Sequence, residues 1–353
     1  MKVNFTKKNL VKAVNKIGKI AFFYKTNELY NNLKISLDDC AVFQINNDIA
    51  FLKTKIQGDV IGQGEICVNP CDFVNIINSL NSETIQIEST ESRLYIRGNK
   101  GVEIYIPLLS NKSFIEGPRL VDFIKKQELL LNSDILKDAF ANCLPFENPK
   151  SLIQGINFKL NKEGQLRLCC CSELSACLYY IENINKSEDL DFTLDTRFLR
   201  DFKDIFDKEK LNISIYERFL EINTENTSLI IRFLNKKFPS IEKVLENPFK
   251  KELPIVKSAF EQAFDLIDVV TKNIDSTIIY KDKKCTIRHE EGVNVVTDID
   301  TGIEEEIHIE REQLRKVFRL INKKEFIALF DKNPKPIVIK EDNKTFLISV
   351  LAK

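Results

Sequence analysis

The chain of 353 residues is too long for one ordinary hydrophobic core and suits two or three domains. Its 43% hydrophobic and 29% charged residues are typical of a globular protein, and 52 basic residues balance 52 acidic ones. A net charge of zero weighs mildly against a nucleic-acid binder, although the distribution of charge matters more than its sum.

No apolar run approaches the roughly 18 residues that a bilayer-spanning helix needs. The first residues, Met1–Lys8, enter an amphipathic pattern and lack the apolar core and the cleavage site of a signal peptide. We therefore expect a cytoplasmic protein.

The first predicted element is an amphipathic helix from about Asn4 to Ile20. Its apolar residues follow the i, i+3, i+4, i+7 spacing of one buried helix face around Ala13. The same stripe returns around Ala139 and Ala263, at distances of 126 and 124 residues. Its members are Leu10, Ala13, Val14 and Ile17, then Leu136, Ala139, Phe140 and Cys143, then Phe260, Ala263, Phe264 and Ile267.

Strand-like alternation follows, and then a second helix near Pro70–Leu80, whose proline is tolerated in a first turn. This helical pattern also returns twice, from Leu194 to Phe206 and from Ile309 to Ile321. The strands predicted in the first unit are Leu33–Leu37, Cys40–Ile45, Ala50–Ile56, Thr84–Glu88, Arg93–Arg97 and Val102–Pro107.

The order helix, strands, helix, strands therefore occurs three times. It predicts an α+β fold of three repeated domains, residues 1–120, 121–248 and 249–353, each with two helices packed on an antiparallel sheet. Three such domains in series form an arc, and sheet edges left open at its ends invite pairing with another chain. A head-to-tail contact between complementary ends would close the arc into a ring as a dimer.

Nine cysteines include three consecutive ones, Cys169 to Cys171, in a strand-like run. Neighbouring strand residues point to opposite faces, so these thiols cannot easily converge on one metal. No CxxC pair exists, and His289 and His308, the two histidines, lie far from that run in the sequence. We expect no metal and no cofactor, and we interpret cysteine as a small buried residue in a reducing compartment.

The sequence contains no GxGxxG, Walker, GxSxG or HExxH motif. Neither histidine has a catalytic partner that a motif identifies. We therefore expect a protein that is not an enzyme. An enzyme or a ligand-binding protein on a triplicated scaffold is the rival hypothesis from a different class.

Basic side chains gather on the predicted helices at a spacing that puts several on one face. Such stripes suit a phosphate backbone, which attracts positive charge without reading the bases. The alternative, left open, is that they only solubilise an exposed helix face. The candidate DNA-binding residues are Lys7, Lys8, Lys12, Lys16 and Lys19, then Arg197 and Arg200, then Arg311, Arg315, Lys316 and Arg319.

The segment Lys237–Pro248, which reads KFPSIEKVLENP, resembles "FPDYRRVLP" at the end of the middle domain of bacterial sliding clamps, the beta subunit of DNA polymerase III. Lys150–Phe158 is similar to the family's "RYYLNG" stretch, and Gly64–Ile77 matches its first-domain segment that enters the second helix. Each motif is weak alone, but the order of all three units fits from Met1 to Lys353.

The resemblance implies a head-to-tail homodimeric ring around duplex DNA that tethers a DNA polymerase, binds no specific sequence and catalyses nothing. It also implies a pocket for short peptide motifs of the polymerase and the clamp loader. The residues that match this pocket are Lys150, Ile153, Cys171, Ala176, Pro239, Val244, Leu347, Ser349 and Leu351. Ordinary packing between domains is the alternative interpretation of the same residues.

The pocket departs from the family at one wall, since "TDGHRLA" is replaced here by the segment from Cys171 to Cys177, CSELSAC. The partner motif could therefore differ, and a plasmid or phage clamp that serves a specialised polymerase is the nearer alternative. The dimer interface implied by the resemblance would pair Ile104 and Ile106 of one chain with Leu266 and Val269 of the other. The helix that carries Leu266 is acidic, which departs from a uniformly basic channel.

Overall fold

The structure, a computed structural model, describes residues 1–22, 32–148, 154–185, 188–246, 248–272, 275–289, 294–298, 303–331 and 335–351. The chain forms two compact units. Unit 1 comprises Met1–Asp138 and Leu194–Leu234, and unit 2 comprises Ala139–Thr193 and Asn235–Lys353. Both combine helices with antiparallel sheets, which confirms the predicted α+β class.

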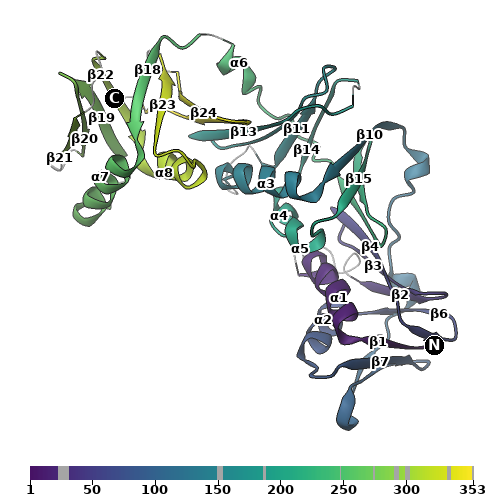
Figure 1. Ribbon diagram of the computed structural model, residues 1–353. Helices are drawn as coiled ribbons and strands as arrows, with labels where there is room; N and C mark the ends of the chain where they lie inside the picture. Colours follow the sequence, from purple (N-terminus) through teal and green to yellow (C-terminus); the bar gives the residue numbers. More distant parts are fainter. Residues whose placement is uncertain are drawn as a thin grey trace. The chain divides into compact units, whose positions relative to one another are not determined.

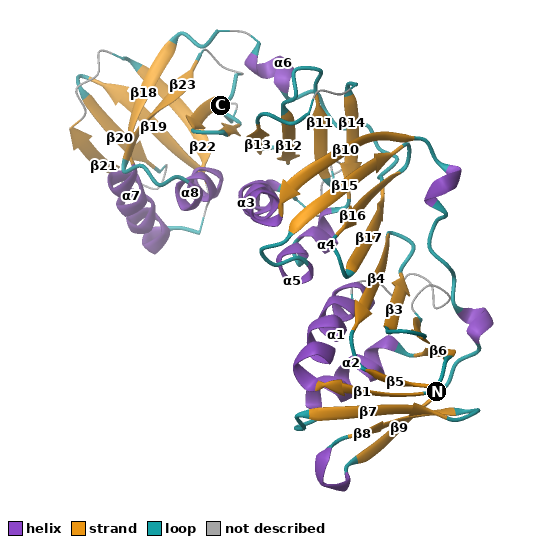
Figure 2. Cartoon of the chain, turned by 45° about the vertical axis from the view of Figure 1, so that its right-hand side comes forward, coloured by secondary structure: helices purple, strands orange, loops and turns teal. Residues whose placement is uncertain are grey.

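Unit 1 contains two antiparallel sheets (Figures 1 and 2). The first has the strand order β5-β1-β7-β8-β9, and the second has the order β10-β15-β16-β17-β4-β3-β2-β6. The strands are β1 (Lys2–Thr6), β2 (Leu33–Leu37), β3 (Ala41–Asn46), β4 (Ala50–Ile56), β5 (Asp59–Ile61), β6 (Gly64–Val68), β7 (Thr84–Ser89), β8 (Arg93–Arg97), β9 (Glu103–Pro107), β10 (Lys125–Asn132), β15 (Lys210–Tyr216), β16 (Phe219–Asn223) and β17 (Thr227–Arg232).

Unit 2 is built in the same way, from sheets of order β14-β11-β12-β13-β25-β24-β23-β18 and β21-β20-β19-β22. The strands are β11 (Ile156–Leu160), β12 (Leu166–Cys171), β13 (Ser175–Ile181), β14 (Leu190–Leu194), β18 (Lys251–Val256), β19 (Asp275–Lys281), β20 (Lys284–Arg288), β21 (Asn294–Asp298), β22 (Glu305–Glu310), β23 (Glu325–Phe330), β24 (Ile337–Glu341) and β25 (Lys344–Ile348).

The threefold apolar stripe forms the buried face of three helices, as the sequence predicts. All twelve of its residues are buried. Burial of each larger apolar side chain stabilises the folded state by about 1.5–3 kcal/mol. In unit 1, α1 packs on β3 and β4 beside α2, and in unit 2, α7 lies next to α8 (Figure 1). The helices are α1 (Lys7–Ala21), α2 (Pro70–Ser79), α3 (Ser133–Cys143), α4 (Thr196–Leu199), α5 (Phe202–Ile205), α6 (Glu242–Leu245), α7 (Lys257–Val270) and α8 (Arg311–Leu320).

Two predicted helices differ in their bounds. The first begins at Lys7 and not near Asn4, because residues 2–6 form strand β1, which buries Val3 and Phe5 by alternation. The pattern from Leu194 to Phe206 forms two short helices, α4 and α5, although Leu199 and Phe202 are buried as the pattern requires.

Each eight-stranded sheet joins strands from two successive repeats of the sequence. In unit 1, β17 pairs with β4, and we call this pairing the first seam. In unit 2, β25 pairs with β13, and we call this pairing the second seam. Both are antiparallel, with five paired positions each. The domain boundaries near residues 120 and 248 stay a prediction, since the two compact units divide the middle repeat between them.

Most of the cysteines are buried: Cys67, Cys143, Cys169, Cys170, Cys171, Cys177 and Cys285. Burial raises the pKa of the thiols of Cys171 and Cys285 to about 12, so they stay protonated at neutral pH. This matches the predicted role of cysteine as a small buried residue. Within the described residues, no helix is both long and apolar enough to cross a bilayer.

Candidate DNA and partner surfaces

The five lysines of α1 are not equivalent. Lys8 and Lys12 are exposed, and no ion pair with a described carboxylate forms at either. Lys7 donates a hydrogen bond from Nζ to the carbonyl of Leu80. Lys19 lies 2.9 Å from a carboxylate oxygen of Asp201 and 2.8 Å from one of Asp204. The side-chain hydrogen bonds to Asp204 and Asp201 raise the pKa of Lys19.

Lys16 lies deeper in the protein than its neighbours. Its Nζ donates to Thr227 Oγ1 over 3.0 Å and lies 3.9 Å from Glu209. Burial lowers its pKa, because a desolvated ammonium loses hydration, and Glu209 opposes that shift. Of the α1 lysines, Lys8 and Lys12 are therefore the ones whose charge is exposed and not bound to a carboxylate of the described chain.

A polar cleft of about 1570 Å³ borders α1 within unit 1. Besides Lys12, Lys16 and Lys19, it is lined by Lys55 on β4, Lys137 on α3 and Lys203 on α5. These three lysines are not predictable from the sequence, because no helical period relates them and only the packing of sheet and helices brings them to α1. Acidic residues line the same cleft: Asp201, Asp204, Asp207 and Glu209.

The arginines of α8 are largely committed to protein contacts. Arg311 is 3% exposed and donates to the carbonyl of Asp275 over 2.7 Å and to Asp268 Oδ1 over 2.7 Å. Arg315 binds Asp265 at 2.8 Å and Asp268 at 2.6 Å. The acidic residues of α7 thus neutralise part of the basic stripe of α8, which explains why an acidic helix accompanies a basic one.

The other candidate cations form local contacts. Lys316 donates to Gln313 Oε1 over 3.1 Å, and the exposed Arg319 lies 3.2 Å from Glu312. Arg197 is paired with Asp195 of the same turn, with Nε donating to Oδ1 over 2.7 Å. Arg200 is exposed on the outer end of the α4 turn.

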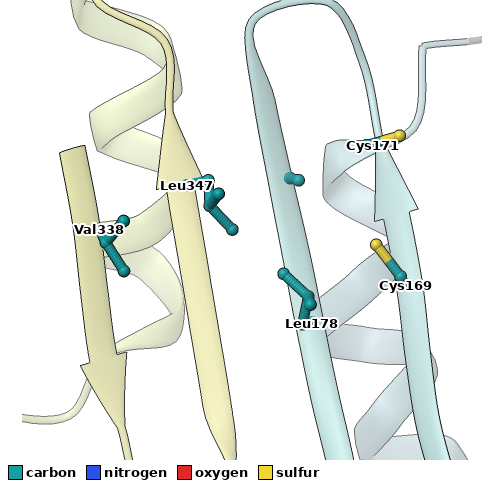
Figure 3. Packing of buried hydrophobic residues seen from close by; sticks show 6 residues of the cluster. Cys169, Cys171, Leu178, Val338 and Leu347 are labelled. Carbon is teal, nitrogen blue, oxygen red and sulfur yellow. The ribbon is translucent and has the colours of Figure 1, made fainter. Parts of the chain in front are cut away.

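Four of the nine residues predicted for the partner pocket come together at the second seam. Cys171, Ala176 and Leu347 belong to a buried apolar cluster with Cys169, Leu178 and Val338, which we call the second-seam cluster (Figure 3). Val244 packs against it, together with Phe238, Ile241, Leu245, Phe249, Tyr180 and Leu329. Lys150 and Ile153 lie outside the described residues.

The remaining described pocket candidates, Pro239, Ser349 and Leu351, form backbone hydrogen bonds. The carbonyl of Pro239 accepts a hydrogen bond from Ile241 N over 3.0 Å. Ser349 N donates to the carbonyl of Leu174 over 2.8 Å, and Leu351 N donates to that of His308 over 2.8 Å. Ser349 and Leu351 are thus tied to the hairpin between β12 and β13 and to β22.

An ion pair between a buried arginine and a partly exposed glutamate holds the segment that covers this cluster. Arg167 on β12 is 5% exposed, and its Nη2 lies 3.1 Å from Glu242 on α6. Lys159 lies 3.5 Å from the same carboxylate. No pattern in the sequence predicts this pair, because Arg167 is an isolated cation in a run of apolar strand residues and its partner lies 75 positions away.

The four candidate interface residues differ in exposure. Ile104 on β9 is 36% exposed, whereas Ile106 is 5% exposed and packs inside its own unit. On α7, Leu266 is 49% and Val269 is 84% exposed. β9 is an edge strand, as is β21 in unit 2, where Val296 is 55% exposed.

No family model matches the chain. The chain is 24% identical to the beta sliding clamp of Mycoplasma pneumoniae over 375 aligned positions, which cover 99% of this chain and 96% of that protein. Among solved structures, the Helicobacter pylori beta clamp bound to a DNA ligase peptide matches with a TM-score of 0.86 at 17% identity and full coverage of both chains. The Bacillus subtilis DNA polymerase sliding clamp matches with a TM-score of 0.86 at 18% identity, over 100% of this chain and 99% of that one.

Proposed function

We propose that this chain, a divergent homologue of the bacterial beta sliding clamps in sequence and fold, is itself a sliding clamp. It encircles duplex DNA as a head-to-tail dimer and tethers a DNA polymerase, so that synthesis is processive. The observation that carries the proposal is the agreement of fold over the whole chain, since a ring requires all three repeats.

The DNA contacts in this proposal are electrostatic and independent of sequence. Lys8 and Lys12 on α1 are the best-placed cations there, with Lys16 and Arg319 as weaker contributors. Contacts with phosphates carry no sequence information, so the ring binds every position of the duplex alike and can move along it.

The two seams suggest how the dimer interface is built. The strand order is β16-β17-β4-β3 at the first seam and β24-β25-β13-β12 at the second. The five-stranded sheet ends in β8-β9, and the four-stranded sheet begins with β21-β20. In the order of the repeat, β9 corresponds to β17 and β25, and β21 corresponds to β4 and β13. Since β17 pairs with β4 and β25 with β13, β9 of one chain pairs in this proposal with β21 of the other.

Exposed apolar side chains on both edges support this pairing. Ile104 and Tyr105 on β9 are 36% and 53% exposed, and Val296 on β21 is 55% exposed. Leu266 and Val269 on α7 are available beside such an interface, whereas Ile106 contributes to the core of its own sheet. We therefore retain Ile104, Leu266 and Val269 as interface residues and add Tyr105 and Val296.

Tyr105→Asp tests this interface, because it inserts a charge into the paired edge. We expect the dimer to dissociate to a monomer of 40.8 kDa in analytical ultracentrifugation. Leu130→Asp, on the exposed edge strand β10, is the matched control and should leave the mass unchanged. A dimer that survives the Tyr105 substitution would move the interface elsewhere.

In this proposal the partner peptide binds at the second-seam cluster, and the chain contributes no catalytic step of its own. It acts in the cytoplasm, where bacterial DNA is copied. A plasmid or phage clamp with a specialised polymerase is the second candidate, favoured by the CSELSAC segment. A pull-down with peptides of the host's replicative polymerase separates the two, since only a chromosomal clamp should retain them.

Loading on nicked circular DNA, followed by linearisation, tests the proposed function directly. A ring should co-sediment with the circle and be lost when a restriction enzyme opens it, because a topological link ends at a free end. Equal retention on circular and linear DNA would show ordinary surface binding and contradict the proposal.

A further inference from the structure

The two seams are related position by position. At the first seam Phe51 pairs with Ile230 and Ala50 with Ile231, and at the second Ala176 pairs with Leu347 and Ser175 with Ile348. The next pair inward is fully buried in both seams, as Leu52 with Leu229 and Cys177 with Phe346. Phe51 and Ile230 therefore occupy the positions that Ala176 and Leu347 occupy in the second-seam cluster.

The first seam has an apolar cluster of its own at these positions. Its buried members are Phe51, Cys67, Phe114, Phe219 and Ile230, and we call it the first-seam cluster. A connecting segment covers it, through Leu109, Phe114, Leu120 and Phe123. The second-seam cluster is covered in the same way, by Phe238, Ile241, Val244, Leu245 and Phe249. Figure 2 shows β17 and β4 side by side at this seam.

Gly117 lets that segment lie directly on the ring of Phe51. A Cβ at Gly117 would approach three ring atoms of Phe51 to 2.6–2.8 Å, which no side chain tolerates. Asn46 holds the same segment, donating from Nδ2 to the carbonyl of Ile115 over 3.1 Å. The segment therefore lies directly on the cluster.

A hollow of about 150 Å³ remains between this segment and the strands of the first seam. Its apolar lining comes from β4 and the bend before it, from β16 and β17, and from the segment, and it includes Ile49, Phe51, Ile115, Pro118, Phe219 and Ile230. A cavity of this size holds one benzene-sized group and is well below the roughly 300 Å³ of a typical small-molecule site.

The charges at the rim of the hollow are compensated. Arg232 lies 3.0 Å from Asp48 and above the ring of Phe219, and Glu116 lies 2.9 Å from Lys34. A site with paired rim charges and an apolar floor does not select an ion. It suits an uncharged, apolar side chain that is presented by a larger molecule.

We propose that the first seam is a second docking site, which takes one large apolar side chain from a peptide segment of a partner protein. The repeat relates this site to the second-seam cluster, where the proposed function places a partner peptide, and we infer the same kind of occupant here. The choice of occupant therefore rests on the proposed function. One chain then offers two apolar anchor points, so a partner with two such segments gains effective concentration at the second.

Isoleucine-methyl NMR of the full chain tests the site, with the capped dipeptide N-acetyl-Leu-Phe-amide as the probe. The δ1-methyl groups of Ile49, Ile115 and Ile230 should shift in a saturable way, with a Kd of about 1 mM, as expected for a single anchor. Ile87, in the core of the five-stranded sheet, should stay unchanged, and Ile241 reports separately on the second-seam cluster. N-acetyl-Ser-Ser-amide should shift none of them.

Ile115→Trp fills the hollow and should weaken the shifts at Ile49 and Ile230 at least about tenfold, whereas Ile61→Trp, on the exposed strand β5, should not. If Ile115→Trp disturbs the remaining spectrum, Ile49→Phe fills the same space from the bend before β4. Absence of shifts at the three reporters, or equal shifts in the filled variants, overturns the inference. Retention on circular DNA without any methyl shifts would support the proposed function and rule out the second docking site. Methyl shifts without retention on circular DNA would support the docking site and contradict the proposed function.

Discussion

Helices α1 and α8 look alike in the sequence and differ in the structure. Both carry a stripe of cations, and both lie beside another helix of the same repeat. On α8, Arg311 is buried and Arg315 is paired with two carboxylates of α7, whereas Lys8 and Lys12 of α1 stay exposed. The charge that a helix can offer to DNA therefore depends on its neighbours as much as on its own residues.

Among the substitutions that test this difference between the helices, Arg311→Ala should have the largest effect, and it should lower the free energy of unfolding. It removes a buried cation with three hydrogen-bond partners and leaves Asp268 and the carbonyl of Asp275 without it. We expect a loss of about 2–3 kcal/mol in the free energy of unfolding, discounted because Asp268 is half-exposed. Urea denaturation measures it, and Arg319→Ala, in an exposed pair, should cost under about 1 kcal/mol.

Replacing Lys8 and Lys12 together by alanine should have the largest effect on DNA. If each contacts one phosphate, the slope of log K against log salt concentration should fall by about 0.9 per lysine. Fluorescence anisotropy with a short duplex over a salt series measures this slope. Arg315→Gln is the matched variant on α8 and should change it less, so equal changes would contradict the distinction between the helices.

Asp265→Asn should have the opposite effect and strengthen DNA binding, because it frees part of the charge of Arg315 on α8. It removes one of the two carboxylates that hold Arg315 and leaves the Arg311–Asp268 pair intact. We expect slightly tighter DNA binding and a salt slope that rises by less than about 0.9. Glu261→Gln removes the same charge from α7 at a position with no ion pair among the described residues. Identical gains in both variants would indicate a general charge effect.

Lys19→Met should have the smallest effect, visible only in its pH dependence. The pKa of Lys19 is raised in the folded chain by Asp204 and Asp201. Its contribution is therefore fully present below the ordinary lysine pKa of 10.5 and is lost as the pH rises through the higher folded value. Denaturation at pH 8 and pH 11 should show wild type and variant converging at the higher pH. A constant difference would mean that the ion pairs contribute little.

The sequence was most informative where local periodicity and burial coincide. The threefold stripe predicts three helices, each with one buried apolar face, and all three faces are buried in the structure. Apolar residues at a period of 3.6 all lie on one side of a helix, so burying that side buries all of them. Alternation likewise predicts strands such as Leu33–Leu37 and Ala50–Ile56 at their observed bounds. Residues 2–6 show the limit, because five residues before a helix can continue the helix or form a strand, and only the neighbours β5 and β7 decide it.

The candidate sites depended on contacts that no local pattern contains. The sequence and its resemblance brought Cys171, Ala176, Val244 and Leu347 to one cluster, but Leu178 and Val338 joined it only through the sheet register. Ile104 and Ile106 share one face of β9, yet Ile104 is 36% and Ile106 only 5% exposed, a difference that the pattern of the strand does not contain.

The sequence by itself determined that one α+β unit is repeated three times, because apolar periodicity is a local property of the chain. Only the tertiary structure decided which charges remain available and which repeats share a sheet. Arg167 and Glu242, or Arg311 and Asp268, meet because strands and helices far apart in the chain are packed together. Electrostatic and packing energies depend on distance in space, and sequence separation does not report it.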